Sequence, residues 1–246
     1  MSDSRPSADP LLKALRLELP VAYAPFDAAA VRSGLVVVDE VNGFATVGAG
    51  ALAPSAPDRQ IERMVVETAH LSRLFAKRDA PILAFLDTHE PGKPEPPYPP
   101  HCERGTGEEN LVPALEWLAD CPQATLIRKD CINDFVGAID LKTGANRLAD
   151  WMNVNRLEAL VTVGICTDIC VMDFVSTVLS ARNHGMMPTL KEVVVYEPGC
   201  ATFDLPRRAV LEMGLPETVA HPQALAHHIG LYVMAARGAR LASEVR

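Results

Sequence analysis

The chain has 246 residues, of which 48% are hydrophobic, so it is long enough for one large α/β domain with a sizeable core. Its formal net charge of −8 argues against nucleic acid and anionic membrane surfaces as partners. No apolar run approaches the ~20 residues of a membrane-spanning helix, and the polar N-terminus lacks the apolar core of a signal peptide. We therefore expect a cytoplasmic protein with reduced cysteines.

The first half of the chain begins with a polar segment. Residues 1–10 are rich in Ser, Asp and Pro and are predicted to be disordered. We expect residues 1–20 to form an N-terminal segment ahead of one domain over 21–246. In chain order, the pattern then predicts a short helix over Leu11–Leu19, a buried strand over Gly34–Asp39, a helix over Asp58–Lys77, a strand over Pro81–Leu86, a proline-rich loop over Thr88–Asn110 and a short helix over Leu111–Leu118.

The second half alternates predicted strands and helices. In order, these are a strand over Ala124–Arg128, a helix over Asn146–Val154, a strand over Leu160–Ile165, a helix around Cys170, a strand over Val193–Tyr196, and helices over Leu205–Met213 and Val219–Ala236. Each strand is a near-continuous apolar run, which is typical of a parallel sheet covered on both faces. The sequence therefore predicts an α/β fold that is doubly wound, with a mostly parallel sheet and helices on both faces.

Reactive side chains stand where four predicted strands end. Asp39, Asp87 and Lys129 close or directly follow a strand, and Cys170 follows another strand after a short turn. Sites in open parallel α/β sheets form beyond the carboxyl ends of the strands. We therefore expect these four side chains to converge on one crevice.

The turn before Cys170 is the most informative local pattern. The residues after it are apolar at helical spacing: Val171, Phe174, Val175, Val178 and Leu179. Thr167 or Asp168 can cap the start of this helix. Cys170 would then lie in the first helical turn, where free N–H groups and the helix dipole lower the pKa of a thiol. It is a candidate nucleophile.

Asp39, Lys129 and Cys170 together suggest hydrolysis of an amide. The carboxylate can take the thiol proton, and the ammonium can favour the anionic forms. The thiolate would attack an amide carbonyl to form a thioester, and Asp39 would return the proton to the leaving ammonia. The N–H groups of Cys166 and Cys170 can form an oxyanion hole. Singly, each residue also fits a capping, surface or core role, but the set of three favours catalysis.

Asp87 and His89 begin a candidate metal site. His101 in the following loop supplies a third ligand, and Glu95 is a candidate fourth. Such an oxygen and nitrogen donor set suits a divalent ion, with Zn²⁺ favoured and Mn²⁺ or Fe²⁺ as alternatives. A solvated polar loop is the competing interpretation. Aromatic side chains near the predicted site, namely Phe44, Tyr98 and Phe135, can stack on a planar substrate or simply pack.

Four motifs carry a resemblance to a known family. They are Val38–Phe44, the pair Asp87–His89 and Pro99–Thr106, the dipeptide Arg128–Lys129, and Gly164–Val171. Over roughly residues 30–235 the chain resembles the isochorismatase-like cysteine hydrolases, and within them most closely the plant-type nicotinamidases. The resemblance implies an Asp39-Lys129-Cys170 triad, a metal that anchors a pyridine nitrogen, and a cis peptide between Ile165 and Cys166.

The activity implied by the resemblance is hydrolysis of nicotinamide to nicotinate and ammonia in NAD salvage. The substrate would be a small amide, and Ile169 would line its pocket. Doubly wound domains of this size often self-associate, so a homo-oligomer is a further expectation. Alternatives are another small amide, such as a maleamate, biuret-like or carbamoyl compound, a hydrolase that uses metal-bound hydroxide, and a catalytically silent member. The three candidate metal ligands favour nicotinamide.

Overall fold

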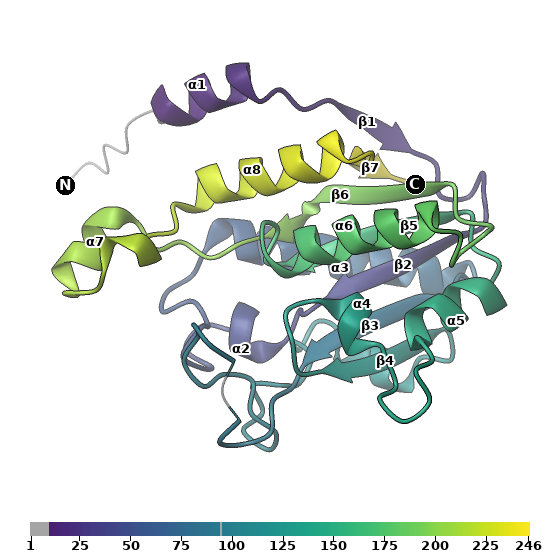
Figure 1. Ribbon diagram of the computed structural model, residues 1–246, viewed down its shortest axis with the longest axis horizontal. Coiled ribbons are helices and arrows are strands. Elements are labelled where there is room, and N and C mark those ends of the chain that lie inside the picture. The colour runs from purple at the N-terminus through teal and green to yellow at the C-terminus, as the bar shows by residue number, and fades with distance from the viewer. Residues whose placement is uncertain (1–9, 94) are drawn as a thin grey trace.

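Seven strands form the centre of the computed structural model, which describes residues 10–93 and 95–246. Their bounds are Tyr23–Phe26 (β1), Ser33–Val38 (β2), Ile82–Asp87 (β3), Ala124–Lys129 (β4), Ala159–Ile165 (β5), Glu192–Ala201 (β6) and Arg240–Val245 (β7). They lie in the order β1-β7-β6-β5-β2-β3-β4 (Figure 1). Every neighbouring pair is parallel, which confirms the predicted parallel sheet.

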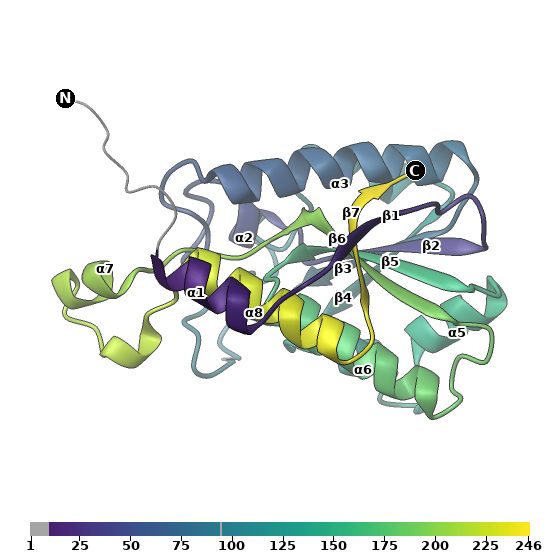
Figure 2. The same cartoon turned by 90° about the horizontal axis from the view of Figure 1, so that it is seen from above.

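Helices cover both faces of the sheet, as predicted. Their bounds are Pro10–Glu18 (α1), Asn42–Ala45 (α2), Arg59–Lys77 (α3), Asp134–Gly137 (α4), Arg147–Val154 (α5), Cys170–Asn183 (α6), Arg207–Glu212 (α7) and Gln223–Ala236 (α8), with 3-10 turns at Glu116–Asp120 (η1) and Glu217–Val219 (η2). Figure 2 shows α3 along one face, with α5, α6 and α8 on the other. The chain is therefore doubly wound.

The central strands are apolar because both of their faces are covered. Every residue of β2, β3 and β5 is buried. Successive side chains of a strand point to opposite faces, so Val36 and Val38 pack into the core on the α6 side, whereas Leu35 and Val37 pack into the core on the α3 side. This double burial fixes the position of β2, and with it the position of Asp39 just beyond its end.

The helix boundaries follow the capping residues in two places. The Asp58 side chain accepts hydrogen bonds from the N–H groups of Gln60 and Ile61 at the start of α3. Asn146 likewise accepts from the N–H of Ala149 at the start of α5. These caps satisfy N–H groups that have no partner inside the helix. Both helices lie where the sequence predicts them.

Two strands at one edge of the sheet were not predicted. The strand β1 reads Tyr-Ala-Pro-Phe and β7 reads Arg-Leu-Ala-Ser-Glu-Val, so neither is a continuous apolar run. They pair with each other, and β7 also pairs with β6. Both strands are short, β1 at the edge contains a proline and β7 beside it carries charges, so composition alone does not distinguish them from loops.

Two predicted helices need correction. The helix predicted over Leu111–Leu118 is instead the 3-10 turn η1, because the segment is short and Pro113 interrupts it. The helix predicted over Val219–Ala236 splits into η2 and α8, since Pro222 stands at the boundary. The predicted disorder of residues 1–10 falls outside the described residues, except that Pro10 begins α1.

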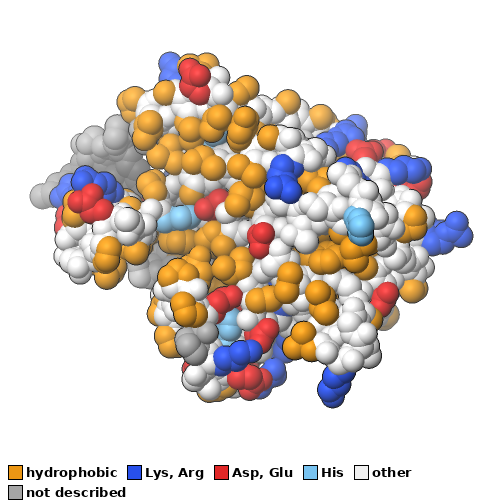
Figure 3. All heavy atoms as spheres, viewed as in Figure 1, with side chains coloured by type: hydrophobic (Ala, Val, Ile, Leu, Met, Phe, Trp, Pro, Cys, Tyr) orange, Lys and Arg blue, Asp and Glu red, His pale blue; other side chains and the backbone are white. Residues whose placement is uncertain are grey.

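The surface agrees with the charge balance of the sequence. On the face drawn in Figure 3, Lys and Arg side chains are scattered among acidic ones rather than gathered into a basic patch. Across residues 10–93 and 95–246, none of the helices is both long enough and apolar enough to cross a membrane.

Candidate active site

The predicted convergence of strand-end residues is present. Strands β2, β3 and β4 are neighbours in the sheet, and Asp87 and Lys129 are direct partners in the β3–β4 register. Asp39 follows β2 directly, and its backbone takes a positive φ of 52°. The three side chains therefore lie along the same sheet end, and all three are buried.

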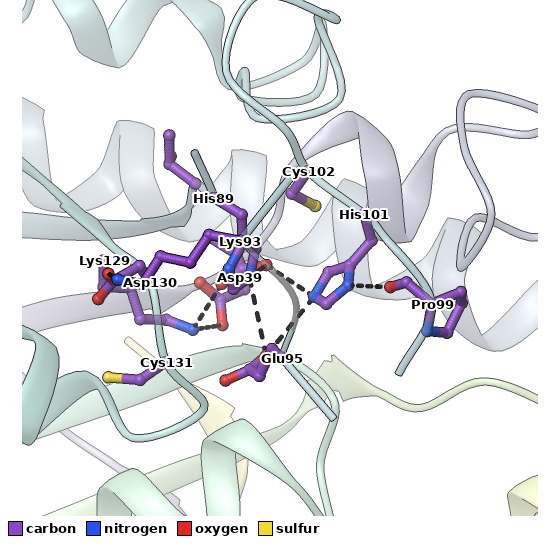
Figure 4. A network of polar contacts seen from close by, with 12 residues as sticks. Asp39, His89, Lys93, Glu95, Pro99, His101, Cys102, Lys129, Asp130 and Cys131 are labelled. Atoms are coloured by element: carbon purple, nitrogen blue, oxygen red, sulfur yellow. Dashed lines mark hydrogen bonds and ion pairs between the residues drawn. The ribbon is translucent and has the colours of Figure 1, made fainter. Parts of the chain in front are cut away.

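Lys129 lies at the centre of this cluster of carboxyl groups. Its Nζ lies 2.7 Å from Asp39 Oδ2 and 3.3 Å from Asp87 Oδ1. A third carboxyl group, Asp134 Oδ1, lies 3.6 Å from the same nitrogen. One ammonium thus faces three buried carboxyl groups, of which the sequence analysis foresaw two. Figure 4 shows Lys129 beside Asp39, with the candidate metal ligands close by.

Burial and charge set the pKa values in opposite directions within the cluster. Complete burial raises the pKa of Asp39 to about 6, against the lowering effects of the Lys129 charge and of the nearby Lys129 and Cys170 side chains. Burial also raises the pKa of Asp134, and the charges of Asp39 and Asp87 add to this rise. Burial would lower the pKa of Lys129, but the surrounding carboxylates raise it well above its usual range. Asp39 therefore has the pKa of a base that can work near neutral pH.

Cys170 lies in the first turn of α6, as predicted, and is its first residue, but the cap differs from the prediction. The N-cap position is Ile169, without a side-chain cap hydrogen bond, so neither Thr167 nor Asp168 caps the helix. Their side chains are bonded elsewhere: Asp168 to Thr202 and His221, and Thr167 to His227. The peptide between Ile165 and Cys166 is cis, as the family resemblance implied.

The expected low pKa of the Cys170 thiol is wrong for this arrangement. Burial raises its pKa well above the usual range, and the Asp39 and Asp134 charges raise it further, whereas Lys129 lowers it. The helix dipole does not offset the desolvation of a thiolate at a site that is only 9% exposed. The resting group is therefore a neutral thiol.

The backbone around Cys170 can serve as an oxyanion hole. The carbonyl oxygen of Cys166 accepts from the N–H groups of Ile169 and Val171, which closes the turn. Among the described residues, the N–H groups of Cys166 and Cys170 have no hydrogen-bond acceptor. Two free N–H donors beside a nucleophile suit a developing negative oxygen, which is the role predicted for them.

A second polar network holds this turn from the side. Asp168 Oδ2 lies 2.8 Å from His221 Nε2, and Thr202 donates to the other carboxylate oxygen at 2.7 Å. His221 falls within the helix predicted over Val219–Ala236, but it lies before α8, and its Nδ1 faces the carbonyl oxygen of Phe203 at 2.9 Å. The rings of Phe203 and His221 stack with centroids 3.9 Å apart. The segment between β6 and α8 is thereby fastened to the nucleophile turn.

Asp87, His89 and His101 form a buried group whose ligand atoms all lie within 4.8 Å of one another. Asp87 Oδ2 lies 3.0 Å from His89 Nε2 and 3.2 Å from His101 Nε2. The Glu95 carboxylate is 3.7 Å and 3.6 Å from the same two nitrogens. His101 Nδ1 faces the Pro99 carbonyl oxygen at 2.8 Å, which orients the ring. This donor set fits a divalent metal ion.

The candidate substrate residues have different positions. Phe44 and Tyr98 lie beside the metal ligands, with ring centroids 5.6 Å and 6.1 Å from that of His101. Ile169 directly precedes Cys170, and its side chain is half-buried. Phe135 is buried within the main apolar core on the α6 side. Three of the four therefore border the cluster in ways that suit contact with a substrate, and Phe135 packs into the core beside it.

Sequence reasoning missed Asp134 and the Asp168–His221 pair. Asp134 opens α4, and a helix of four residues leaves no periodic pattern to detect. A carboxyl residue shortly after the end of β4 was the available signal. Asp168 and His221 are far apart in the sequence, so nothing local indicates that they meet. Cys102, Cys121, Cys131 and Cys200 have no disulfide partner, as expected for reduced cysteines.

Comparison with known proteins agrees with this geometry. Residues 33–223 match the model of the isochorismatase domain. The chain belongs to the isochorismatase family. It is 53% identical over 212 residues to Nicotinamidase 1 of Arabidopsis thaliana, a match that covers 86% of each chain. It is also 27% identical over 140 residues to the nicotinamidase/pyrazinamidase of Mycobacterium tuberculosis, covering 56% of this chain and 73% of the relative.

Solved structures show the same isochorismatase fold. Nicotinamidase PncA from Bacillus subtilis superimposes with a TM-score of 0.63 at 21% identity, over 86% of this chain and 99% of that one. The pyrazinamidase of Pyrococcus horikoshii, solved in complex with zinc, superimposes with a TM-score of 0.57 at 20% identity, over 85% of this chain and 98% of that one.

Proposed function

We propose that this protein is a nicotinamidase, which hydrolyses nicotinamide to nicotinate and ammonia in NAD salvage. The observation that carries the proposal is the double role of Asp87. One of its oxygens faces Lys129 and the other faces His89 and His101. The metal site and the nucleophile cluster are therefore parts of one site. The identity to the Arabidopsis nicotinamidase supports the same substrate.

Asp39 and Cys170 carry the proton transfer in this proposal. The Cys170 thiol donates its proton to Asp39, and the sulfur forms a bond to the amide carbon of the substrate. The N–H groups of Cys166 and Cys170 stabilise the negative oxygen that develops. Asp39 then protonates the amide nitrogen as the carbon–nitrogen bond breaks, and ammonia leaves.

The thioester is cleaved by the reverse use of the same groups. Asp39, again ionised, takes a proton from a water molecule whose oxygen attacks the thioester carbon. The carbon–sulfur bond breaks, the acid product leaves, and Cys170 regains the proton. Throughout, the Lys129 ammonium holds Asp39 at 2.7 Å and offsets the negative charge of the thiolate. The high resting pKa of Cys170 means that its proton leaves as the sulfur attacks.

The metal ligands would select the substrate. A divalent ion held by Asp87, His89 and His101 would supply a Lewis acid for a ring nitrogen of the substrate. Zinc is the ion that we propose, because one carboxylate and two imidazoles are common zinc ligands and the Pyrococcus pyrazinamidase of the same fold was solved with zinc. Phe44, Tyr98 and Ile169 are the side chains that we propose to contact the substrate.

The cellular setting is part of the proposal. We place the reaction in the cytoplasm, because six free cysteines suit a reducing compartment. Self-association of the domain stays a prediction.

The test is ammonia release from nicotinamide by purified wild-type protein and by Cys170→Ala. Cys121→Ala is the matched control, since this thiol lies between η1 and β4 and donates its hydrogen bond to Gln123. We expect release by wild type and by the control, and a loss of at least about a thousandfold in Cys170→Ala.

Other outcomes would identify the alternatives. Full activity of Cys170→Ala would replace the thioester mechanism by one that uses metal-bound hydroxide. Release from maleamate, biuret or carbamoyl compounds, but not from nicotinamide, would keep the cluster and change the substrate. An inactive wild-type protein across this panel would indicate a silent member.

A further inference from the structure

A single helical turn, α4, holds Lys129 at both ends of its side chain. A Cβ added at Gly137 would lie 2.6 Å from the Lys129 Cβ and 3.4 Å from its Cδ, so the backbone of this turn rests directly on the lysine stem. At the other end of α4, Asp134 Oδ1 lies 3.6 Å from Lys129 Nζ. The turn therefore contacts both the stem and the charged head of the lysine.

Asp134 has no other polar role in the described chain. Its side chain is fully buried, and neither carboxyl oxygen has a hydrogen-bond partner among residues 10–93 and 95–246. Burying an unsatisfied polar group is unfavourable, so a leucine or alanine would suit a purely structural position better. The Lys129 ammonium is the only basic group that the described residues place within 4 Å of this carboxyl.

The ammonium has a place for a third partner. A lysine head offers three N–H donors, and Asp39 and Asp87 occupy two directions at 2.7 Å and 3.3 Å. Asp134 faces the same nitrogen from α4. An acceptor on that side keeps the ammonium from rotating away from Asp39. An apolar side chain there would offer the ammonium no acceptor, so it would not hold this orientation.

Hydrogen bonds also connect α4 to α6, the helix that carries Cys170. Asn133 caps α4 by accepting from the N–H of Val136 at 2.9 Å. Its amide nitrogen donates to Asp173 Oδ2 at 2.9 Å and to Thr177 Oγ1 at 2.8 Å, both on α6. These bonds therefore fix the position of Asp134 relative to α6.

We propose that Asp134 is a positioning residue for Lys129, which keeps the ammonium directed at Asp39 and within electrostatic reach of Cys170. The role rests on the proposed function, because it acts through the Asp39-Lys129-Cys170 cluster. It predicts that an acceptor atom at position 134 matters more than the volume of the side chain.

The test compares Asp134→Asn, which retains an acceptor oxygen, with Asp134→Leu and Asp134→Ala, which do not. Asp140→Asn is the control, since Asp140 is exposed and bonds only within its own loop. Steady-state kinetics, thermal unfolding and bound metal per chain are measured for each. We expect Asn to keep kcat within about threefold, and Leu and Ala to lose about ten- to a hundredfold in kcat with little change in KM. Bound metal stays constant.

A second measurement does not need the substrate. Lys129 lowers the pKa of Cys170, so a displaced ammonium reduces the thiolate fraction and slows alkylation of Cys170 by iodoacetamide. We expect slower alkylation at pH 7 in Ala and Leu but not in Asn. Wild-type kcat and alkylation in a folded Asp134→Ala variant would overturn the proposal, as would equal losses in Asn and Ala. A wild-type protein that is inactive on nicotinamide but shows the alkylation pattern would overturn the proposed function alone.

Discussion

The carboxylate of Asp168 lies 2.8 Å from Nε2 of His221, across the gap between the nucleophile turn and the segment that leads into α8. Burial would lower the pKa of His221, but the hydrogen bond and charge of Asp168 raise it above its usual range. Burial would raise the pKa of Asp168, but His221 and Thr202 lower it. The pair therefore makes stability depend on pH.

The sign of this dependence follows from the two shifts. The His221 contribution is fully present below its unfolded pKa and is lost as the pH rises through its raised folded pKa. The Asp168 contribution is present above its unfolded pKa and is lost as the pH falls through its lowered folded pKa. The pair is thus most stabilising between about pH 4 and pH 6.5.

We therefore expect His221→Gln to lower the unfolding free energy more at pH 5.5 than at pH 8.5, with a difference of about 1 kcal/mol. Urea denaturation at the two pH values measures it. His70→Gln, which changes an exposed histidine on α3, should show no such difference. A deficit of the same size at both pH values would contradict an ionic contribution from this pair.

Asp39→Asn removes the proposed base and keeps the shape of the side chain. We expect kcat to fall by about a hundred- to ten-thousandfold, because the amide cannot take the thiol proton. The ammonia assay measures the loss, and circular dichroism checks that the fold remains. Asp120→Asn, which changes an exposed residue of η1, is the matched control and should keep wild-type activity. A mild effect of Asp39→Asn would assign the base to another group.

The metal ligands can be separated by content as well as by activity. His101→Ala removes a ring within 3.2 Å of Asp87, so we expect bound metal to drop to a small fraction of the wild-type stoichiometry. Glu95→Ala should have a weaker effect, about tenfold in affinity, because its carboxylate lies farther from the group. Metal analysis after gel filtration measures both. Equal metal content in wild type and His101→Ala would remove His101 from the site.

Gly164 is required where β5 ends beside β2. Its φ is +130°, and a Cβ there would overlap the carbonyl oxygen of Val38. We expect Gly164→Ala to lower the unfolding free energy by at least about 3 kcal/mol, since backbone strain and a clash combine.

Gly185→Ala separates these two causes. Its φ is also positive, at +87°, but a Cβ there meets nothing within 4 Å. It should cost only about 1–2 kcal/mol. Similar costs for the two variants would show that the contact with Val38 relaxes freely.

The sequence was sufficient where burial was continuous or where a motif was local. The strands β2, β3 and β5 were predicted because both faces of each are covered, which leaves an unbroken apolar run. Asp39, Lys129 and Cys170 were identified by their places at strand ends. The strand β1 at the edge and its neighbour β7 were missed because their pairing depends on partners that are distant in the sequence rather than on composition.

The electrostatics of the site needed coordinates. A helix start predicts a lowered thiol pKa, but the burial of Cys170 and the carboxyl groups around it raise that pKa instead. The sequence could not single out Asp134 among the acidic residues as a site residue, because only its distance to Lys129 in the folded chain indicates a role. Desolvation and charge neighbours are properties of the packed chain, so no local pattern encodes them.

The pairing of β1 with β7 has a consequence for the order of events during synthesis. Tyr23 is opposite Leu241 in the register, so this edge of the sheet joins segments made early and late on the ribosome. The neighbouring strands β5, β2, β3 and β4, which carry the candidate site, are all complete before β7 emerges. A nascent chain can therefore assemble the reactive centre before β1 has paired with β7.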